Sequence, residues 1–328
     1  MPDAVAPLTS APSSGAPLSQ ASLAQAPLAG SSLVGSSLSH ASLAQASLEA
    51  VAKLLLDHPG TVVLTGAGMS TDSGIPDYRG PDGQRRVTPM QHGEFVGSSA
   101  ARQRYWARSF IGWQRFSHAE PNDCHRSVSA LQARGVLGPV ITQNVDGLHQ
   151  AAGSRDVTEL HGTLAEVLCL TCGTRTDRDL LQARMAEQNP GFEALASGEA
   201  PDGSRVSSQI RPDGDIVLDD ALVTAFQLPH CSTCGADTLK PDVVFFGGSV
   251  PRERVDTCYD LTDEAPALLV LGSSLAVMSG LRFVRHAAKR GIPVMAITRG
   301  PTRGDDLMTV RVDAPLRPSL RALVDHQA

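Results

Sequence analysis

The stretch that decides the fold is "TVVLTGAGMSTDSGIPDYRG", residues 61–80. Its apolar run at 62–64 leads directly into Gly66 and Gly68, as in a strand that opens onto a nucleotide-binding turn. A dehydrogenase fingerprint has a third glycine where this chain has Thr71, and an acidic residue about 20 positions further on that closes a second strand. Neither feature is found here. The stretch is therefore a damaged hydride-transfer site, a chance pair of glycines, or a loop that handles a dinucleotide in another way.

Apolar runs and helical patterns alternate along most of the chain. Strands are predicted at 61–65, 139–142, 157–160, 267–271 and 293–297. Helices are predicted at 42–58, 102–116, 122–135 and 280–291. This alternation indicates an α/β fold with a Rossmann-like, doubly wound parallel sheet. Ligands of such sheets bind at the carboxyl ends of the strands, and four predicted ends carry small or polar residues: "GAGMS", "QNVDGLH", "HGT" and "GSS".

The composition is that of a globular protein without a basic surplus. Of the 328 residues 41% are hydrophobic. The formal net charge is −6, so there is no surplus of basic side chains to neutralise nucleic-acid phosphates. Residues 1–52 contain neither Lys nor Arg, which fits neither a secretory signal nor a transit peptide. No run of about 18 apolar residues could span a bilayer. We therefore expect a cytoplasmic monomer with no membrane partner and no specific nucleic-acid partner.

Residues 1–41 differ from the rest of the chain. They are rich in Ala, Ser, Pro and Leu, and a near repeat is found at 21–28 and 41–48 ("ASLAQAPL" and "ASLAQASL"). The leucines recur about every five residues, which matches neither a strand nor a helix face. We predict a disordered, low-complexity tail over 1–41 that acts as a solubilising extension.

Four of the six cysteines form two C-x-x-C pairs, each followed by a glycine. Four thiolates at this spacing predict a closed, structural zinc site with no open position for water. Disulfides are disfavoured without an export signal, and a thioredoxin-like redox pair needs only one C-x-x-C. The gap at 173–230 is longer than in a zinc ribbon, so an extra element is expected there. Cys124 and Cys258 are interpreted as buried apolar residues. The predicted zinc ligands are Cys169, Cys172, Cys231 and Cys234.

Several motifs together resemble the sirtuin family of NAD-dependent protein deacylases. In order, they are "GAGMSTDSGIPDYR", "TQNVDGLH", "ELHG", the two C-x-x-C pairs, "KPDVVFFG" and "GSSLAV". "RQRYWARSFIGW" and "GPTRGDDL" are similar to the class II branch of the family and resemble its mitochondrial sirtuin-four-like members. The resemblance covers about residues 42–328 and implies one catalytic domain. Its large, Rossmann-like lobe would comprise 42–84, 119–162 and 242–328, and its small lobe a helical part at 85–118 and an inserted zinc module at 163–241.

The resemblance implies that NAD is bound and consumed as a co-substrate. Gly66, Ala67, Gly68 and Ser70 would cradle its pyrophosphate through backbone N–H groups. The full set of implied NAD contacts is Gly66, Ala67, Gly68, Met69, Ser70, Gly74, Ile75, Pro76, Asp77, Tyr78, Arg79, Gln143, Asn144, Val145, Asp146, Gly272, Ser273, Ser274, Thr298, Arg299, Gly300 and Leu316. His149, in "DGLH", is interpreted as structural.

The implied chemistry begins when the acyl oxygen of a modified lysine attacks C1′ of the nicotinamide ribose and nicotinamide leaves. Asp77 and Asn144 would hold the nicotinamide carboxamide. His161 would act as general base on a ribose hydroxyl, a task for which imidazole has a suitable pKa. Attack of the 2′-oxygen on the acyl carbon, and then water, would give free lysine and acyl-ADP-ribose. The implied catalytic residues are His161, Asn144 and Asp146.

The acylated peptide would bind between two segments of the chain. Residues 243–247 and 274–280 resemble the segments between which the substrate strand pairs through backbone hydrogen bonds. Tyr105 and Arg108 resemble the Tyr-x-x-Arg with which some sirtuins bind acidic acyl groups, and a solvated helix face is the alternative. The implied substrate-binding residues are Val243, Val244, Phe245, Phe246, Gly247, Tyr105 and Arg108.

Three positions depart from the usual family pattern. Tyr78 replaces a phenylalanine, Thr298 replaces an asparagine, and Gly248 stands where an acidic residue is usual. An NAD-dependent ADP-ribosyltransferase or a lipoamidase-type deacylase could use the same pocket, and an NAD-binding regulator is a further alternative. Retention of His161 beside "QNVD" favours deacylation, because a sensor would need no base. A dehydrogenase is disfavoured by the missing third glycine, so the opening stretch is interpreted as a loop that breaks NAD.

Overall fold

The computed structural model describes residues 40–78, 89–196, 216 and 218–326. Residues 1–39, which make up nearly all of the predicted tail, lie outside the described residues. No helix within the described ranges is both long and apolar enough to cross a membrane.

Six parallel strands form the main sheet, in the order β3-β2-β1-β7-β8-β9. They are β1 (Thr61–Thr65), β2 (Leu137–Thr142), β3 (Val157–Glu159), β7 (Leu268–Leu271), β8 (Val294–Ile297) and β9 (Val310–Val312). From β1 the chain builds outward through β2 to β3, and from β7 it builds the other way through β8 to β9. The predicted doubly wound sheet is confirmed, and the space beyond the carboxyl ends of β1 and β7 is its topological switch point.

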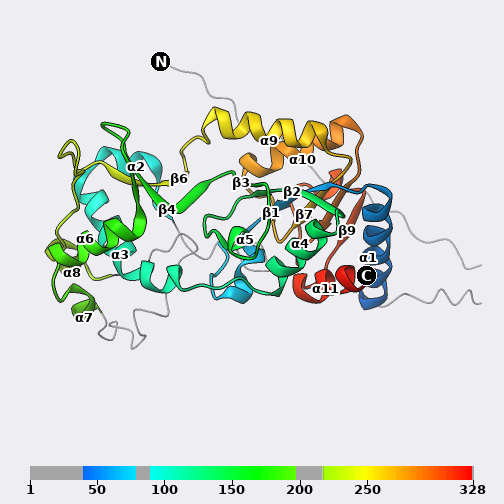
Figure 1. The fold of residues 1–328 in the computed structure, drawn as a ribbon, viewed down its shortest axis with the longest axis horizontal. Helices are drawn as coiled ribbons and strands as arrows, with labels where there is room; N and C mark the ends of the chain where they lie inside the picture. The colour runs from blue at the N-terminus through cyan, green and yellow to red at the C-terminus, as the bar shows by residue number, and fades with distance from the viewer. Residues whose placement is uncertain (1–39, 79–88, 197–215, 217, 327–328) are drawn as a thin grey trace, which may run out of the picture. The chain divides into compact units, whose positions relative to one another are not determined.

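Helices cover both faces of this sheet (Figure 1). The helices α1 (His40–Asp57), α4 (Asp123–Ala133) and α11 (Leu316–His326) share one core with the sheet, and α9 (Arg252–Glu264) and α10 (Met278–Arg290) share the other. Strand β1 shows why both cores form. Val63 belongs to the first core, whereas Val62 and Leu64 belong to the second, because successive side chains of a strand point to opposite faces. A strand buried on both faces reads as a continuous apolar run, which in β1 is Val62, Val63 and Leu64 between two buried threonines.

A second, antiparallel sheet begins immediately after His161. Its order is β5-β4-β6, formed by β4 (Gly162–Cys169), β5 (Arg175–Asp177) and β6 (Leu239–Val243). The helices α2 (His92–Gly97) and α3 (Ser99–Ser117) contribute Phe95, Trp106 and Phe110 to a separate core with β4 and β6. The segment between the cysteine pairs carries α6 (Arg178–Gln188), α7 (Phe192–Ala196) and α8 (Asp220–Ala225), so the expected extra element is present.

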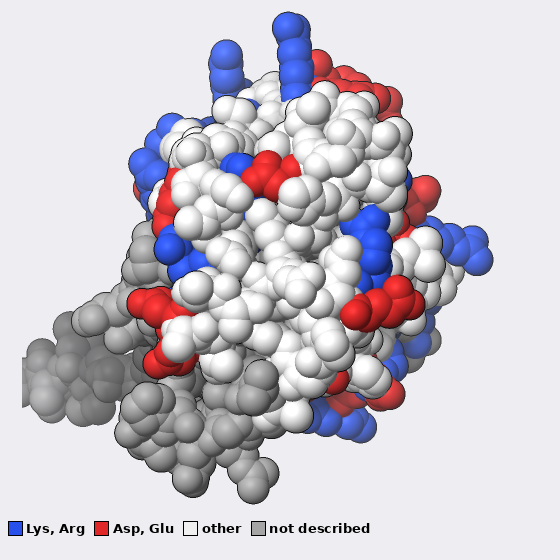
Figure 2. Space-filling model, turned by 90° about the vertical axis from the view of Figure 1, so that its left-hand side faces the viewer, with Lys and Arg blue, Asp and Glu red and all other residues white. Residues whose placement is uncertain are grey.

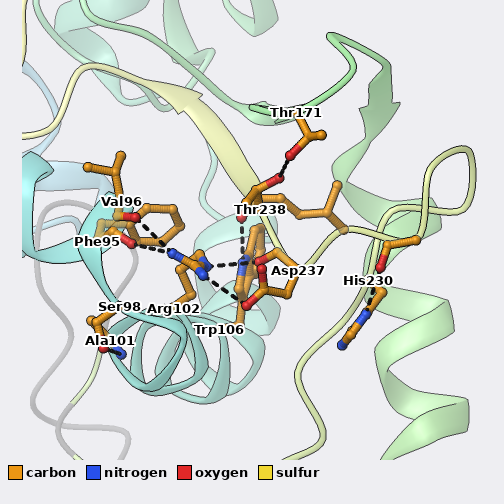
Figure 3. A network of polar contacts seen from close by, with 12 residues as sticks. Phe95, Val96, Ser98, Ala101, Arg102, Trp106, Thr171, His230, Asp237 and Thr238 are labelled. Carbon is orange, nitrogen blue, oxygen red and sulfur yellow. Dashed lines mark hydrogen bonds and ion pairs between the residues drawn. The ribbon is translucent and has the colours of Figure 1, made fainter.

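Arg102 of α3 ties this helix to the loop that carries the second cysteine pair (Figure 3). Its Nε donates to the carbonyl oxygen of Asp237 at 2.9 Å, and its Nη2 donates to the carboxylate of the same residue at 2.8 Å. Its Nη1 donates to the carbonyl oxygens of Phe95 and Val96, both at 3.1 Å. The indole Nε1 of Trp106 donates to the carbonyl oxygen of Leu239 at 2.9 Å. One face of α3 therefore holds both the cysteine-bearing loop and β6 in place.

The surface at this end of the domain is mostly uncharged. Figure 2 shows acidic and basic side chains scattered between uncharged ones on this face, without a continuous patch of one sign among the described residues.

Candidate active site

A cavity of ≈ 990 Å³ opens at the switch point of the main sheet. Small-molecule sites range over about 300–1,000 Å³, so this volume can take a dinucleotide together with part of a second substrate. The walls come from the ends of β1, β2, β6, β7 and β8 and from the start of α10. Of the implied NAD contacts, the described residues that line the cavity are Gly66, Ala67, Gly68, Ser70, Ile75, Pro76, Asp77, Tyr78, Gln143, Asn144, Val145, Asp146, Gly272, Ser273, Ser274, Thr298, Arg299 and Leu316.

Three of the implied contacts that the structure describes are not found in the cavity wall. Met69 is fully buried below the loop, and Gly74 turns the chain with a φ of 81°. The N–H of Gly300 donates to the carboxylate of Asp313 at 3.1 Å, and Gly300 does not line the cavity. Arg79 lies outside the described residues.

Gly66 and Gly68 allow the ends of β1 and β7 to approach each other. A Cβ added to Gly66 would lie 2.8 Å from the Cβ of Ser273, and one added to Gly68 would lie 2.9 Å from the Cα of Gly272. The N–H groups of both glycines are hydrogen-bonded within the protein in this conformation, and the pyrophosphate contact stays a prediction. The N–H of Gly66 donates to the carbonyl oxygen of Leu271 at 3.0 Å, and that of Gly68 donates to the carbonyl oxygen of Gly272 at 2.9 Å. The two glycines therefore act here by close packing of the loops.

Asn144, Ser70 and Asp146 form a polar chain across the cavity floor. The amide Nδ2 of Asn144 donates to the carbonyl oxygen of Gly66 at 3.1 Å and lies 3.0 Å from the hydroxyl of Ser70. That hydroxyl donates to the carboxylate of Asp146 at 2.6 Å, and the N–H of Leu148 donates to the other carboxylate oxygen at 3.0 Å. Burial raises the pKa of Asp146, while these two hydrogen bonds oppose the rise. The chain fixes the β2 loop against the β1 loop.

His161 lies between the two sheets, and each of its two ring nitrogens is within hydrogen-bonding distance of a different partner. Its Nδ1 is 2.8 Å from the carbonyl oxygen of Gln143, and its Nε2 is 2.8 Å from the hydroxyl of Ser279. Burial lowers the pKa of His161 below its usual value, and the bond to Gln143 opposes this shift. The imidazole is therefore neutral at pH 7 and, since it lines the cavity, can accept a proton there.

The loop after β1 closes one side of the cavity. Ile75 is buried, and Pro76, Asp77 and Tyr78 line the wall. The ring of Tyr78 packs edge-on against that of Phe246, with 5.5 Å between centroids. This contact joins the predicted nicotinamide loop to the predicted peptide segment.

Another part of the wall follows the ends of β7 and β8. The loop after β7 contains Leu275, whose φ of 53° is rare for a residue with a side chain. Its N–H donates to the hydroxyl of Ser273 at 3.2 Å, and the hydroxyl of Ser273 also accepts the Nε2 proton of Gln143 at 2.9 Å. Such a strained residue persists where its surroundings hold it, and here they hold Ser273 and Ser274 in the cavity wall.

The predicted peptide segment lies along the same cavity. All five residues at 243–247 line it, as do Met278 and Ser279 at the start of α10. The buried ammonium of Lys240 donates to the carbonyl oxygens of Pro241 and Val243 and lies 4.5 Å from the ring centroid of Phe245. Burial lowers the pKa of Lys240 to about 8. Sequence reasoning did not single out this lysine, since a charged residue on a strand gives no sign of burial.

Tyr105 and Arg108 do not line the cavity, and their binding of the acyl group stays a prediction. Tyr105 is 1% exposed and packs against the rings of Phe95, Trp106 and Phe245. The aromatic core of the small sheet therefore holds this face of α3 behind Phe245, which itself lines the cavity. Helical spacing alone could not separate a core face from a pocket face.

The four paired cysteines come together in a compact cluster. Their Sγ atoms all lie within 4.8 Å of one another, with Cys169 and Cys234 3.6 Å apart and Cys172 and Cys231 3.7 Å apart. A disulfide would need about 2.05 Å, whereas thiolates about 2.3 Å from a tetrahedral ion lie about 3.8 Å apart. The cluster therefore fits a four-thiolate metal site, and none of its cysteines lines the cavity.

Three residues interpreted as structural have that role in the structure. Cys124 and Cys258 are buried, and burial raises the pKa of each thiol to about 12, so neither is a nucleophile at pH 7. His149 is 1% exposed, with its Nε2 3.1 Å from the hydroxyl of Thr65, and burial lowers its pKa to about 3.

Comparison with known proteins identifies the family. The Sir2 family model matches residues 66–279. The chain is 53% identical over 268 residues to NAD-dependent protein deacetylase 1 of Streptomyces coelicolor, covering 81% of this chain and 86% of that protein. It is 47% identical over 257 residues to the mitochondrial NAD-dependent protein lipoamidase sirtuin-4 of Bos taurus, covering 77% and 78%.

Solved structures agree with this assignment. A Sir2 complex with a p53 peptide and NAD+ is 28% identical, with a TM-score of 0.64, and covers 85% of this chain and 97% of that one. A further structure of a Sir2 enzyme has a TM-score of 0.66 at 28% identity and covers 86% and 98%. The cavity at the switch point, its histidine and the four-cysteine cluster are thus found in a chain that belongs to the Sir2 family.

Proposed function

We propose that this protein is an NAD-dependent protein lysine deacylase, which moves the acyl group of a modified lysine onto ADP-ribose and releases nicotinamide. The observation that carries the proposal is His161, a neutral imidazole in the wall of a cavity at the switch point of the sheet. Relatives of this chain named NAD-dependent protein deacetylases support it.

The residues of this chain would divide the reaction between them. Asp77 and Asn144 line the cavity and would hold the carboxamide of nicotinamide through their polar side chains. His161 would take the proton of a ribose hydroxyl at Nε2, so that the ribose oxygen can attack the acyl carbon. Asp146 accepts a hydrogen bond from Ser70 and thereby keeps the floor of the cavity in place.

We propose that the four cysteines hold one structural zinc ion. Cluster geometry supports this, since four thiolates leave no coordination position for water. The ion would stabilise the loops at 169–172 and 231–234, and catalysis would proceed without it as a participant.

The acyl group is proposed to be uncharged. Neither Tyr105 nor Arg108 reaches the cavity to bind an acidic acyl group, and the wall at 243–247 contains no charged side chain. Acetyl-lysine is therefore the first candidate, supported by the names of the bacterial relatives. A lipoyl group is the second, supported by 47% identity to a sirtuin named as a lipoamidase. The monomeric state and the cytoplasmic location are further proposals, supported by composition alone.

The experiment is a panel of peptides carrying acetyl, lipoyl, long-chain or succinyl lysine, each incubated with NAD and analysed by mass spectrometry. We expect free lysine, nicotinamide and O-acyl-ADP-ribose, with an uncharged acyl group preferred over succinyl. Succinyl preference would contradict the assignment of the acyl group. Transfer of ADP-ribose to protein without loss of any acyl group would contradict deacylation and favour an ADP-ribosyltransferase.

A further inference from the structure

Ser279 contacts the proposed base directly, at the ring nitrogen of His161 that carries the lone pair. The Nδ1 of His161 lies 2.8 Å from the carbonyl oxygen of Gln143. A carbonyl can only accept, so Nδ1 carries the proton and Nε2 carries the lone pair. The hydroxyl of Ser279, 2.8 Å from Nε2, therefore donates to that lone pair. The ring is held at both nitrogens.

The position of Ser279 is fixed by close packing at the start of α10. A Cβ added to Gly280 would lie 2.6 Å from Oε1 of Gln143, so a larger residue there would displace the end of the Gln143 side chain. The Nε2 of Gln143 donates to the hydroxyl of Ser273 at 2.9 Å and to the carbonyl oxygen of Thr65 at 3.1 Å. Gln143 thus holds Nδ1 of His161 with its carbonyl and contacts the helix that carries Ser279 with its side chain.

We propose that Ser279 is a positioning residue for the general base His161, an inference that rests on the proposed deacylation. In the free enzyme its hydroxyl donates to Nε2 and holds the imidazole in the tautomer that can accept a proton. Because Nε2 has one lone pair, the ribose hydroxyl takes the place of the Ser279 hydroxyl at this nitrogen before it gives up its proton. The proton moves from the ribose oxygen to Nε2, and the electron pair left on that oxygen forms the bond to the acyl carbon.

The test compares two steps of the reaction in Ser279→Ala, Ser279→Thr and the wild type. Exchange of isotope-labelled nicotinamide into NAD, in the presence of acetylated peptide, reports the step before the base acts. Release of free lysine reports the whole reaction. A positioned base contributes about 10²–10⁴-fold, so we expect Ser279→Ala to lower kcat for lysine release by at least about tenfold. Nicotinamide exchange and the KM for NAD should stay within about twofold, and Ser279→Thr, which keeps a hydroxyl, should recover most of the activity.

Ser117→Ala is the matched control, because it removes an exposed hydroxyl that donates to the carbonyl oxygen of Gln114 on α3. A Ser279→Ala enzyme with wild-type kcat, or with exchange and lysine release reduced equally, would overturn the proposal. Nitrogen NMR of labelled histidine tests the contact without turnover: the Nε2 resonance of His161 should shift in Ser279→Ala and not in Ser117→Ala. A wild type that lacks deacylation would overturn the proposed function, while an unchanged Nε2 resonance would overturn the contact itself.

Discussion

Replacing Arg102 with methionine should destabilise the small sheet more than any exposed arginine substitution on the same helix. Methionine keeps an unbranched apolar side chain, so the change removes the guanidinium with little loss of packing volume. The guanidinium donates to Asp237 twice and to the carbonyl oxygens of Phe95 and Val96, and its side chain is 9% exposed.

The expected cost follows from these partners. Breaking a buried ion pair by removing one member costs about 3–5 kcal/mol, because the other member stays without compensation. The side chain of Asp237 is 26% exposed and regains some water, which places the cost at the lower end, about 3 kcal/mol. Arg104→Met is the control, since Arg104 pairs with Glu94 at side-chain exposures of 32% and 45%, and such pairs contribute about 0–1 kcal/mol.

Urea unfolding followed by circular dichroism measures both variants. Asp237→Asn and the double variant complete a cycle that isolates the coupling between the two side chains. A loss below about 1 kcal/mol in Arg102→Met, or a loss equal to that of Arg104→Met, would refute the view that Arg102 holds the cysteine-bearing loop.

Three further predictions concern the backbone, pH and metal. Gly162→Ala should lower the free energy of unfolding in urea by at least about 3 kcal/mol, because the φ of Gly162 is 81° and the new Cβ would lie 1.8 Å from the carbonyl oxygen of Asp242. Gly135 has a φ of 73° with free space around it, so Gly135→Ala should lower this free energy by only about 1–2 kcal/mol. Burial lowers the pKa of His125 to about 4 and of His149 to about 3, below the unfolded value of about 6.5, so their contribution to stability is complete above pH 6.5 and is lost as pH falls toward 3. The urea concentration at the midpoint of unfolding should therefore be lower at pH 5.5 than at pH 7, and the difference should be smaller in His149→Gln than in the wild type. An equal difference in the two proteins would contradict this assignment. Metal analysis should find one zinc per chain, and a chelator that removes it should unfold the small sheet, whereas Cys258→Ser should keep the ion. A metal-free protein with an unchanged small sheet would disprove the structural role.

The strands of the main sheet could be predicted because each is a short apolar run buried on both faces. Strand β1 was predicted at its observed bounds, and β2, β3, β7 and β8 within two residues. Strand β9 is only three residues long, and its Arg311 interrupts the apolar run, so the pattern gave no signal. Helix α9 buries Cys258 and Thr262, which do not form a recognisable apolar stripe.

Helix α11 was missed although its signal was present. Leu316, Leu320 and Leu323 recur at helical spacing, and Leu320 and Leu323 are buried. Pro318 lies in its first turn, where proline is tolerated, so it does not prevent the helix.

Most residues of the predicted cofactor set line one cavity, because the carboxyl ends of parallel strands meet at one edge of the sheet. Contacts between distant segments could not be predicted in this way. The bond between His161 and Ser279 joins residues 118 positions apart, and the burial of Tyr105 depends on rings contributed by two other segments, those of Phe95 and Phe245. A motif names the residue types, whereas tertiary packing decides whether α3 reaches the cavity, and none of its residues lines it.

The most direct test of the central claim is the stoichiometry of NAD consumption with an acylated lysine peptide. We predict one nicotinamide and one acyl-ADP-ribose for each lysine freed, with His161→Ala binding NAD but freeing no lysine. Formation of NADH, nicotinamide release without free lysine, or unchanged turnover in His161→Ala would contradict the account.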